Sequence, residues 1–300
     1  MKKEAKLTVF ENQNLEQILD KPSNDNIITP NDKRLKIIIP GNLWIVDNFF
    51  TDKECDSMIS LTEKLGFETA TLNIGNNVQV IDTYTRNCLR CMIDDFKAGE
   101  IILKRLENVL PTVNEGGILS SVNERLRVLK YSKNNEFKTH NDGLFPRELN
   151  GVSERSVITL QIYLNDNEKG GETIFYNDNL FKDSKGEYRC QPKKGRVAIF
   201  RQYGFLHCGA KVDELKYTIR SDIMYRTLNA DEKKQAKEAS EGTELTSKEK
   251  CNFCGEIIKF SSSTCKDKFL LRCGCINWLE KSRPMFYCVT CDNKCKFEKD

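Results

Sequence analysis

The histidines constrain the fold of this chain more than any other feature of its sequence. The chain has 300 residues and only two histidines, His140 and His207, and His140 is followed two positions later by Asp142. Two imidazoles and one carboxylate form a facial triad, the ligand set that holds non-haem Fe(II) and leaves the opposite positions open. Side chains this far apart in sequence can share a metal only if the strands between them fold back on themselves, as in a closed double-stranded β-helix. The alternative is that the two histidines are unrelated and that residues 141–143 form an ordinary turn.

Composition and charge narrow the class of protein. A hydrophobic content of 39% is enough for a real core, and 30% charged residues favour a soluble protein. The net charge of +3 is too balanced to indicate nucleic-acid binding by itself. No run of about eighteen apolar residues is present, so no membrane span and no membrane partner are expected. The N-terminal residues lack the uninterrupted apolar core of a secretory signal, and we therefore expect an intracellular, cytoplasmic protein.

Changes in composition divide the chain into four regions. Residues 1–34 are polar and are expected to form a flexible N-terminal arm, with one short helix at 15–19. Residues 35–228 carry the strand and helix patterns of a folded domain. Residues 229–250 are largely Lys, Glu, Ala and Ser without core periodicity, which predicts a charged linker. Residues 251–300 contain eight of the thirteen cysteines and form the fourth region.

The folded domain is expected to have a strand-rich core with helices outside it. Short apolar runs separated by turn residues predict strands at 35–39, 43–46, 125–131, 156–164, 172–176, 195–200 and 216–225. Thr51 and Glu54 form a capping box, which predicts a helix that ends at Gly66. A second helix is expected at about 99–110, before Pro111. These patterns favour a mainly β fold, a sandwich or barrel with flanking helices.

The last predicted strand carries cations on one face. Strand alternation places Lys216, Thr218 and Arg220 on the same side. A cation deep inside a barrel is costly unless an anion pairs with it. A dicarboxylic cosubstrate that chelates iron at one end would supply that anion at its other end. Either cation could instead reach solvent along an apolar surface.

Several motifs occur in a fixed order around the two histidines. Segments 127–131 and 137–143 lead into the first histidine, Tyr-Leu-Asn ends the segment 155–165, Gly-Gly-Glu-Thr begins the segment 170–175, and the segment 192–200 precedes His207. The sequence Val-Asp-Asn-Phe-Phe at 46–50 and the helix after it precede them. This order resembles the prolyl 4-hydroxylase branch of the 2-oxoglutarate and Fe(II)-dependent dioxygenases, over roughly residues 40–228.

The resemblance implies a fold and an activity. The fold is a double-stranded β-helix, or jelly roll, oxygenase core that is mainly β with flanking helices. The activity is hydroxylation of a substrate C–H bond, with peptidyl proline as the expected substrate and conversion of 2-oxoglutarate to succinate and CO2. Fe(II), 2-oxoglutarate and ascorbate are the expected cofactors. His140, Asp142 and His207 would bind the iron and carry catalysis.

The resemblance also implies which residues bind 2-oxoglutarate. Tyr131 and Tyr163 match positions that hydrogen-bond the cosubstrate, although each could be an ordinary core aromatic. Lys216, nine residues past His207, matches the basic residue that pairs with the distal carboxylate. Many prolyl hydroxylases keep this base ten residues after the histidine, and Arg220, thirteen after it, points the same way. Lys216 is the expected base and Arg220 the alternative.

The substrate is less constrained, because one fold hosts many functions. The loops at 82–90, 145–153 and 177–189 are expected around the mouth of the site. Arginines in or beside these loops are candidates for substrate contact, or simply solvated charges: Arg86, Arg90, Arg147 and Arg155. The spacing of Arg220 and Arg226 also occurs in the nucleic-acid dealkylase branch of the superfamily, which is one alternative. A non-catalytic binding protein on a degenerate barrel is another.

The C-terminal cysteines predict a zinc-binding module. Cys251 with Cys254, and Cys288 with Cys291, form two Cys-x-x-Cys knuckles, the pairing typical of a structural tetrahedral site. Four more cysteines are enough for a second site: Cys265, Cys273, Cys275 and Cys295. Disulfides in an oxidising compartment are the alternative. Such a module is expected to recruit a protein or nucleic-acid partner, and the sequence does not decide between them. The remaining cysteines are expected to be buried thiols.

Overall fold

The computed structural model describes most of the expected oxygenase-like domain and little of the cysteine-rich region. The described residues are 3–4, 7–39, 41–73, 78–111, 113–114, 117–176 and 186–227, together with the backbone of three short C-terminal strands, β20 (Lys259–Phe260), β21 (Met285–Tyr287) and β22 (Lys294–Glu298). The predicted linker at 229–250 lies outside the described residues. So do all the expected zinc ligands except Cys295, which lies on β22, where only the backbone is described.

Two β-sheets form the core of the domain, and neighbouring strands in them run antiparallel except for β2 and β8. The path through the larger sheet is β2 (Phe10–Glu11), β8 (Leu89–Asp94), β11 (Arg125–Tyr131), β19 (Lys216–Arg226), β14 (Val152–Tyr163), β17 (Val197–Arg201), β4 (Leu43–Val46) and β3 (Leu35–Ile39). Off this path are β5 (Glu68–Thr69), β9 (Val113–Asn114), β10 (Gly117–Val122) and β13 (Pro146–Leu149). The smaller sheet has the order β12 (Phe137–His140), β18 (His207–Gly209), β15 (Thr173–Tyr176) and β16 (Glu187–Cys190). A third, minor sheet joins β1 (Lys3–Glu4), β7 (Gln79–Ile81) and β6 (Leu72–Asn73).

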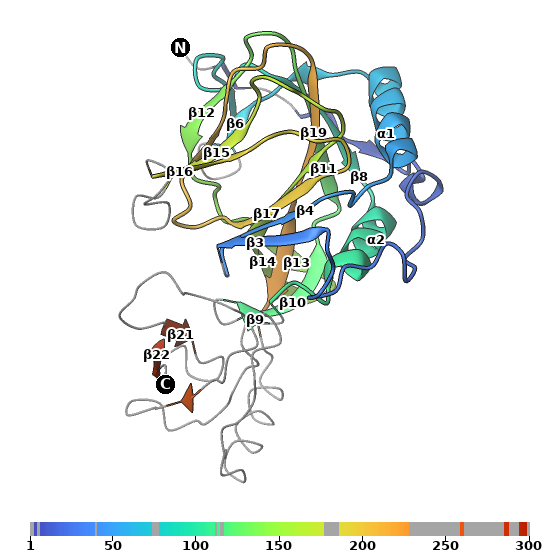
Figure 1. Cartoon of the computed structure of the whole chain (residues 1–300). Coiled ribbons are helices and arrows are strands. Elements are labelled where there is room, and N and C mark those ends of the chain that lie inside the picture. Colours follow the sequence, from blue (N-terminus) through green and yellow to red (C-terminus); the bar gives the residue numbers. More distant parts are fainter. Residues whose placement is uncertain are drawn as a thin grey trace.

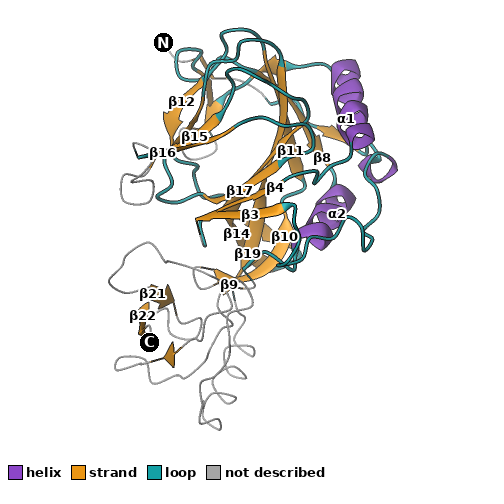
Figure 2. Cartoon of the chain, viewed as in Figure 1, coloured by secondary structure: helices purple, strands orange, loops and turns teal. Residues whose placement is uncertain are grey.

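The smaller sheet faces the larger one, and the helices cover the other face of the larger sheet (Figures 1 and 2). Side chains of the two sheets meet in an apolar cluster that includes Tyr163, Phe175 and Phe200. The rings of Phe175 and Phe200 are 4.9 Å apart and nearly perpendicular, a favourable edge arrangement. The prediction of a mainly β fold with flanking helices is therefore confirmed, and two facing antiparallel sheets are consistent with a jelly-roll oxygenase core.

Helix α1 (Asp52–Leu65) has the predicted capping box. Thr51 Oγ1 accepts from the Glu54 backbone N–H at 3.2 Å, and the Glu54 carboxylate accepts from the Thr51 N–H at 2.7 Å. Helix α2 (Phe96–Leu106) begins three residues before the predicted start, because the Asp95 side chain caps it by accepting from Ala98 N–H. It also ends four residues before the predicted end.

Strand alternation on β19 separates an apolar face from a polar one. Tyr217 and Ile219 belong to the main apolar core, which also contains Met58 of α1 and Ile102 of α2. The alternate residues of β19, among them Lys216, point to the other face, toward the smaller sheet. The predicted shared face of Lys216, Thr218 and Arg220 therefore lies inside the domain, between the two sheets. The helices pack on the apolar face of β19, and the polar side chains of its opposite face line the space between the two sheets.

The N-terminal region differs from the expected flexible arm. Leu15, Leu19 and Ile28 are buried in the main core, and residues 15–17 form a short 3-10 helix, η1 (Leu15–Gln17). The Ile28 N–H donates to the carbonyl of Arg105 in α2 at 2.7 Å. The region was expected to be loose because its few apolar residues show no periodicity, and their burial depends on contacts with distant parts of the chain.

The five cysteines whose side chains the structure describes are free and buried, as predicted: Cys55, Cys88, Cys91, Cys190 and Cys208. Among the described residues, no helix is long and apolar enough to cross a membrane.

Candidate metal centre

Strands β12 and β18 bring the two histidines together. His140 and His207 are directly opposite each other across this antiparallel pair, and their ring centroids are 4.4 Å apart. Asp142 follows β12 by two residues. One nitrogen from each histidine and one carboxylate oxygen of Asp142 all lie within 4.8 Å of one another. The three side chains that were far apart in sequence therefore form one cluster with the composition of a facial triad.

Backbone carbonyls fix the orientation of both imidazoles. His140 Nδ1 lies 2.7 Å from the Lys138 carbonyl oxygen, and His207 Nδ1 lies 2.9 Å from that of Phe205. A carbonyl oxygen can only accept, so each Nδ1 carries the hydrogen and each Nε2 keeps its lone pair. Both Nε2 atoms are 3.8 Å from the Asp142 carboxylate. Histidines held in this way are typical of metal sites, where the second ring nitrogen sets the tautomer.

The electrostatic surroundings keep His140 neutral and Asp142 charged. Burial and, to a smaller extent, the neighbouring His207 lower the pKa of His140 to about 4. Burial alone would raise the pKa of Asp142, but Arg220, the two histidines and a hydrogen bond from Thr159 outweigh it and hold the pKa below its usual value. A neutral imidazole and an ionised carboxylate are the forms that bind metal, so His140 and Asp142 are in their binding forms over a wide pH range.

Lys216 lies deep inside the domain without an anionic partner. Its side chain is 2% exposed, and Nζ donates to the Gly171 carbonyl oxygen at 2.7 Å. Among the described residues, no carboxylate lies within ion-pair distance of it. Burial lowers the pKa of Lys216 to about 8, against the opposing effects of Cys88 and Glu172. A buried ammonium of this kind is costly unless an anion binds beside it.

The two tyrosines have different surroundings. The Lys216 ammonium lies 4.6 Å from the centroid of the Tyr131 ring, a cation–π contact, so these two side chains line the same interior space. The Tyr163 hydroxyl donates to Thr173 Oγ1 at 2.7 Å, within the apolar cluster between the sheets. Thr218, two residues after Lys216, has a buried Oγ1 without a hydrogen-bond partner among the described atoms. The interior space therefore contains, among the described residues, a cation without a carboxylate partner and a hydroxyl without a hydrogen-bond partner.

Arg220 lies nearer the triad than Lys216 and is already paired. Its Nη2 atom is 3.2 Å from Asp142 Oδ1 and 3.1 Å from Asp222 Oδ1. Asp222 was not identified from the sequence, although strand alternation places it on the same face as Arg220 and could have found it. Two other contacts of this centre were also missed. Thr159, which donates a hydrogen bond to Asp142, cannot be distinguished in the sequence from other threonines in strands. Gln202 lies just after β17, and no sequence pattern marks it as a site residue.

Three of the four arginines proposed for substrate contact fall into two groups. Arg90 pairs with Glu68 at 3.1 Å, and Arg147 pairs with Glu124 and Glu154, so both are neutralised within the protein. Arg86 is different, because its guanidinium lies 4.7 Å from the centroid of the Phe137 ring. The His140 imidazole also stacks on that ring, with the two centroids 3.6 Å apart. Arg86 therefore lies close to the triad.

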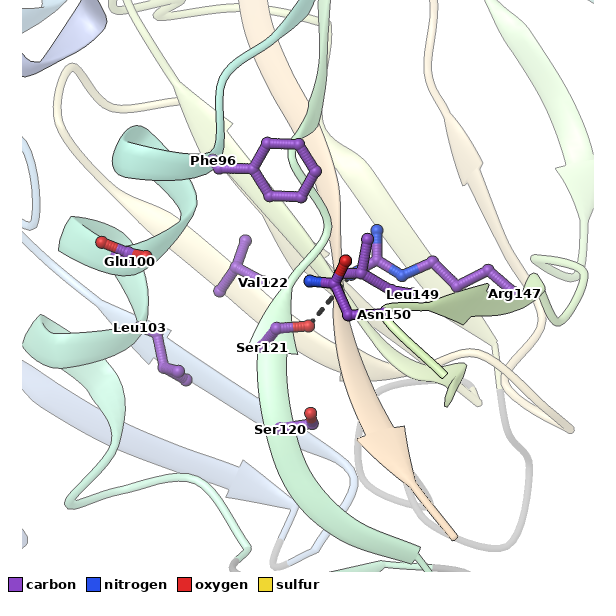
Figure 3. A pocket seen from close by; sticks show the side chains of 9 residues that line it. All are labelled: Phe96, Glu100, Leu103, Ser120, Ser121, Val122, Arg147, Leu149 and Asn150. Atoms are coloured by element: carbon purple, nitrogen blue, oxygen red, sulfur yellow. Dashed lines mark hydrogen bonds between the residues drawn. The ribbon is translucent and has the colours of Figure 1, made fainter. Parts of the chain in front are cut away.

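A separate hollow of about 470 Å³ lies between α2 and strands β10 and β13, away from the triad (Figure 3). Its lining is Phe96, Glu100, Leu103, Ser120, Ser121, Val122, Arg147, Leu149 and Asn150. Arg147, its one cation, donates to Ser121 Oγ at 3.1 Å besides its two carboxylate partners. None of the residues predicted to bind iron or 2-oxoglutarate lines this hollow, so it is distinct from the candidate metal centre.

Comparison with known proteins gives matches over the region that contains this centre. The family model of the 2OG-Fe(II) oxygenase superfamily matches residues 126–221. The chain is 27% identical over 196 residues to Prolyl 4-hydroxylase 2 of Arabidopsis thaliana, an alignment that covers 59% of this chain and 62% of the relative. It is 27% identical over 184 residues to Probable prolyl 4-hydroxylase 11 of the same plant, covering 57% of this chain and 60% of the relative. The chain thus spans less than two thirds of the length of these relatives.

Two solved structures are also similar. A Pseudomonas putida prolyl-4-hydroxylase aligns with a TM-score of 0.45 and 12% identity, covering 64% of this chain and 96% of that one. The viral collagen prolyl hydroxylase of Paramecium Bursaria Chlorella virus-1, in its 2OG complex, aligns with a TM-score of 0.42 and 21% identity, covering 61% of this chain and 96% of that one.

Proposed function

We propose that this chain is a 2-oxoglutarate- and Fe(II)-dependent dioxygenase that hydroxylates a C–H bond, with peptidyl proline as the substrate and succinate and CO2 as coproducts. The observation that carries the proposal is the cluster of His140, Asp142 and His207, in which backbone carbonyls orient both imidazoles through Nδ1. The family match over residues 126–221 and the prolyl 4-hydroxylase relatives support it.

The residues present fit an iron ion. His140 and His207 would bind it through Nε2 and Asp142 through a carboxylate oxygen, which leaves further positions free for other ligands. Fe(II) together with 2-oxoglutarate supplies the oxygen activation of such enzymes. The protein orients the imidazoles through the carbonyls of residues 138 and 205 and keeps Asp142 ionised. It also buries most of the centre from water. Ascorbate is proposed as a reductant that keeps iron in its divalent state.

Lys216 is the proposed partner of the distal carboxylate of 2-oxoglutarate. It is buried and has no carboxylate partner among the described residues, whereas Arg220 already contacts Asp142 and Asp222. The unpartnered Thr218 hydroxyl and the Tyr131 side chain would complete this end of the binding space. Tyr163 is the least supported of the proposed cosubstrate residues, because its hydroxyl is already bound to Thr173.

The surroundings of the triad support a peptide substrate. Leu144, Tyr203 and Leu206 are among the exposed large apolar side chains and stand within four residues of an iron-binding position. Tyr84, which is 79% exposed, stacks on Lys138, two residues before His140. Exposed apolar side chains that gather near one site are typical of recognition surfaces for partly apolar ligands such as a proline-containing peptide.

The alternatives have less support. Under the hypothesis of a nucleic-acid dealkylase, Arg220 would hold 2-oxoglutarate and Arg226 would assist the base site. However, Arg220 is paired with two carboxylates, and Arg226 lies at the opposite end of β19 from Lys216. A degenerate, non-catalytic barrel is disfavoured because the triad geometry is intact.

A turnover assay tests the proposed function. The purified chain is incubated with Fe(II), ascorbate, 2-oxoglutarate and a panel of proline-containing peptides and alkylated oligonucleotides, and succinate is measured. We expect succinate and a peptide product with one added oxygen atom by mass spectrometry. The His140→Ala variant should produce no succinate, because removal of one imidazole leaves the iron with two protein ligands.

The control for this experiment is Lys133→Ala, a change in the exposed turn between β11 and β12. It should turn over like the unmodified chain. Undiminished turnover by His140→Ala would refute the proposed centre. If the oligonucleotides are oxidised and the peptides are not, the substrate is nucleic acid and not peptidyl proline.

We also propose that residues 251–300 form a zinc-binding module, joined by the charged linker at 229–250, that recruits a protein or nucleic-acid partner. The sequence supports this through its two Cys-x-x-Cys knuckles, with Cys251, Cys254, Cys288 and Cys291 as ligands. Cys265, Cys273, Cys275 and Cys295 are the proposed ligands of a second ion.

A further inference from the structure

A closed ring of polar contacts joins the Asp142 carboxylate to a second, buried carboxylate. Thr159 Oγ1 donates to Asp142 Oδ2 at 2.6 Å, and Gln202 Nε2 donates to Thr159 Oγ1 at 3.2 Å. Gln202 Nε2 also donates to Asp222 Oδ1 at 2.7 Å. Arg220 Nη2 closes the ring, 3.1 Å from Asp222 Oδ1 and 3.2 Å from Asp142 Oδ1. We call these five residues the carboxylate ring.

The donors and acceptors of the carboxylate ring allow one arrangement. The Gln202 Oε1 atom accepts from Ser156 Oγ at 2.7 Å, which fixes the orientation of the amide and commits both Nε2 hydrogens to Thr159 and Asp222. Thr159 must then accept from Gln202 and donate to Asp142. Thr159, Gln202 and Asp222 are almost completely buried. A fully satisfied polar network in a poorly solvated interior is rigid, so both oxygens of Asp142 are held in place.

Asp222 also sets the charge behind the triad. Its Oδ1 atom faces Arg220, and its Oδ2 atom lies 3.1 Å from Arg127 Nη1 and 3.3 Å from Asn123 Nδ2. A guanidinium so close to Asp142 would repel a divalent cation at the triad unless a negative charge balances it, since Coulomb interactions are poorly screened in the interior. Asp222 supplies negative charge to Arg220 and shares it with Arg127.

We propose that Asp222 is a positioning residue of the metal centre. Acting through Arg220 and Gln202, it holds the Asp142 carboxylate in its metal-binding orientation and cancels the Arg220 charge beside the ion. The inference rests on the proposed function, because the ion would be the Fe(II) of the dioxygenase. Strand β19 thereby has two roles on one face: Lys216 faces the cosubstrate end, and Asp222 supports the metal end.

Metal affinity separates this role from a merely structural one. The full chain is titrated with Mn(II), which prefers oxygen and nitrogen ligands and therefore avoids the cysteine-rich region, and the free ion is followed by electron paramagnetic resonance. We expect Asp222→Asn to bind Mn(II) about 10- to 100-fold more weakly, the usual effect of losing an outer partner of a ligand. The double variant Arg220→Gln/Asp222→Asn removes the cation that contacts Asp142 and should recover part of the lost affinity, because the charge of Arg127 remains.

Two further variants keep the test decisive. Gln202→Met removes both amide hydrogen bonds without a change of charge, and should weaken Mn(II) binding severalfold even if Asp222→Asn does not fold. Glu154→Gln is the matched control, because Glu154 is another buried carboxylate paired with an arginine, Arg147, on the same sheet. It should destabilise the fold, as judged by thermal unfolding, and leave Mn(II) affinity unchanged.

The outcomes are distinguishable. Wild-type Mn(II) affinity in both folded Asp222→Asn and Gln202→Met would overturn the role of Asp222 and leave the proposed function standing. Affinity in the double variant that is as low as in Asp222→Asn would overturn the charge-balance part. An unmodified chain that binds no Mn(II) at the triad would overturn the proposed function itself.

Discussion

At the scale of single residues, the unusual feature is that Lys216 is a buried cation whose ammonium contacts a carbonyl oxygen and an aromatic ring and, among the described residues, forms no ion pair. An anion bound beside the Lys216 ammonium would offset the cost of burying this charge. We predict that Lys216→Met raises the KM for 2-oxoglutarate about 100-fold, because losing one partner of a buried charge pair costs several kcal/mol. The kcat at saturating cosubstrate should change much less.

Lys216→Arg is the matched variant, since it retains the charge. It should keep a KM within about tenfold of the unmodified chain, the difference reflecting the different shape of the guanidinium. If Lys216→Met leaves the KM unchanged and Arg220→Met raises it, then the distal carboxylate is held by Arg220 instead.

The lowered pKa of Lys216 predicts a pH dependence. The pKa of the free protein is about 8, and only the protonated ammonium attracts a carboxylate, so binding raises this pKa. The affinity for 2-oxoglutarate should therefore be constant below about pH 8 and fall above it. The KM for 2-oxoglutarate, measured from pH 6.5 to 9.5, tests this. In Lys216→Arg the KM should stay flat across the same range, and a parallel rise in both proteins would assign the effect to another group.

At the scale of elements, one turn controls how α1 meets the sheet. Gly195 lies just before β17 with a φ of +75°, and its carbonyl oxygen accepts from Phe49 N–H at 2.7 Å and Phe50 N–H at 3.0 Å. A Cβ at this position would lie 2.1 Å from the Phe50 carbonyl oxygen. We predict that Gly195→Ala lowers the free energy of unfolding by about 3–5 kcal/mol, because the left-handed backbone and the overlap both add cost.

Gly151 provides the comparison for this prediction. It has a similar φ of +76°, but a Cβ there would meet no atom within 4 Å. Gly151→Ala should therefore lower the free energy of unfolding by only about 1–2 kcal/mol, the cost of the left-handed conformation alone. Chemical denaturation of the two variants measures the difference, and equal losses would show that the contact with Phe50 does not constrain the turn.

The elements also show what the sequence could predict. The strands at 35–39, 43–46 and 125–131 match the structure because their apolar runs are bounded by clear turn residues. Strands β12 and β18, which carry the histidines, were not predicted. They are only four and three residues long and contain polar side chains where a core strand would have apolar ones. The polar residues of the metal centre thus interrupt the run of apolar residues from which a core strand is predicted.

A similar argument explains the missed contacts of the metal centre. The triad was predictable because histidine is scarce and because the motif order resembles a known family. The role of Arg220 was not, because spacing alone suggested a cosubstrate partner, whereas its position depends on Asp142, which lies just after β12, as well as on Asp222 of its own strand. Contacts that close only in three dimensions leave no periodic signal in a single sequence.

At the scale of the whole molecule, the proposed zinc module is chemically different from the candidate iron centre. Thiolates suit zinc, whereas imidazole and carboxylate in a facial triad suit Fe(II). We predict that the full chain contains both metals and that they are lost independently. Elemental analysis of the purified chain should find zinc, and Cys288→Ser/Cys291→Ser should lower the zinc content by about one ion per chain, since two of four thiolates rarely retain the metal.

The two sets of variants test this independence in opposite directions. His140→Ala should lose iron and keep zinc, and Cys288→Ser/Cys291→Ser should keep iron binding at the triad. Cys55→Ala, which changes a buried free thiol in α1, controls for loss of any cysteine and should leave both metals in place. A chain purified without zinc under reducing conditions, or a double cysteine variant with full zinc content, would contradict the module. Because structural zinc sites hold such small domains folded, chelation of zinc should also make the C-terminal region selectively sensitive to protease while the residues around the triad stay protected.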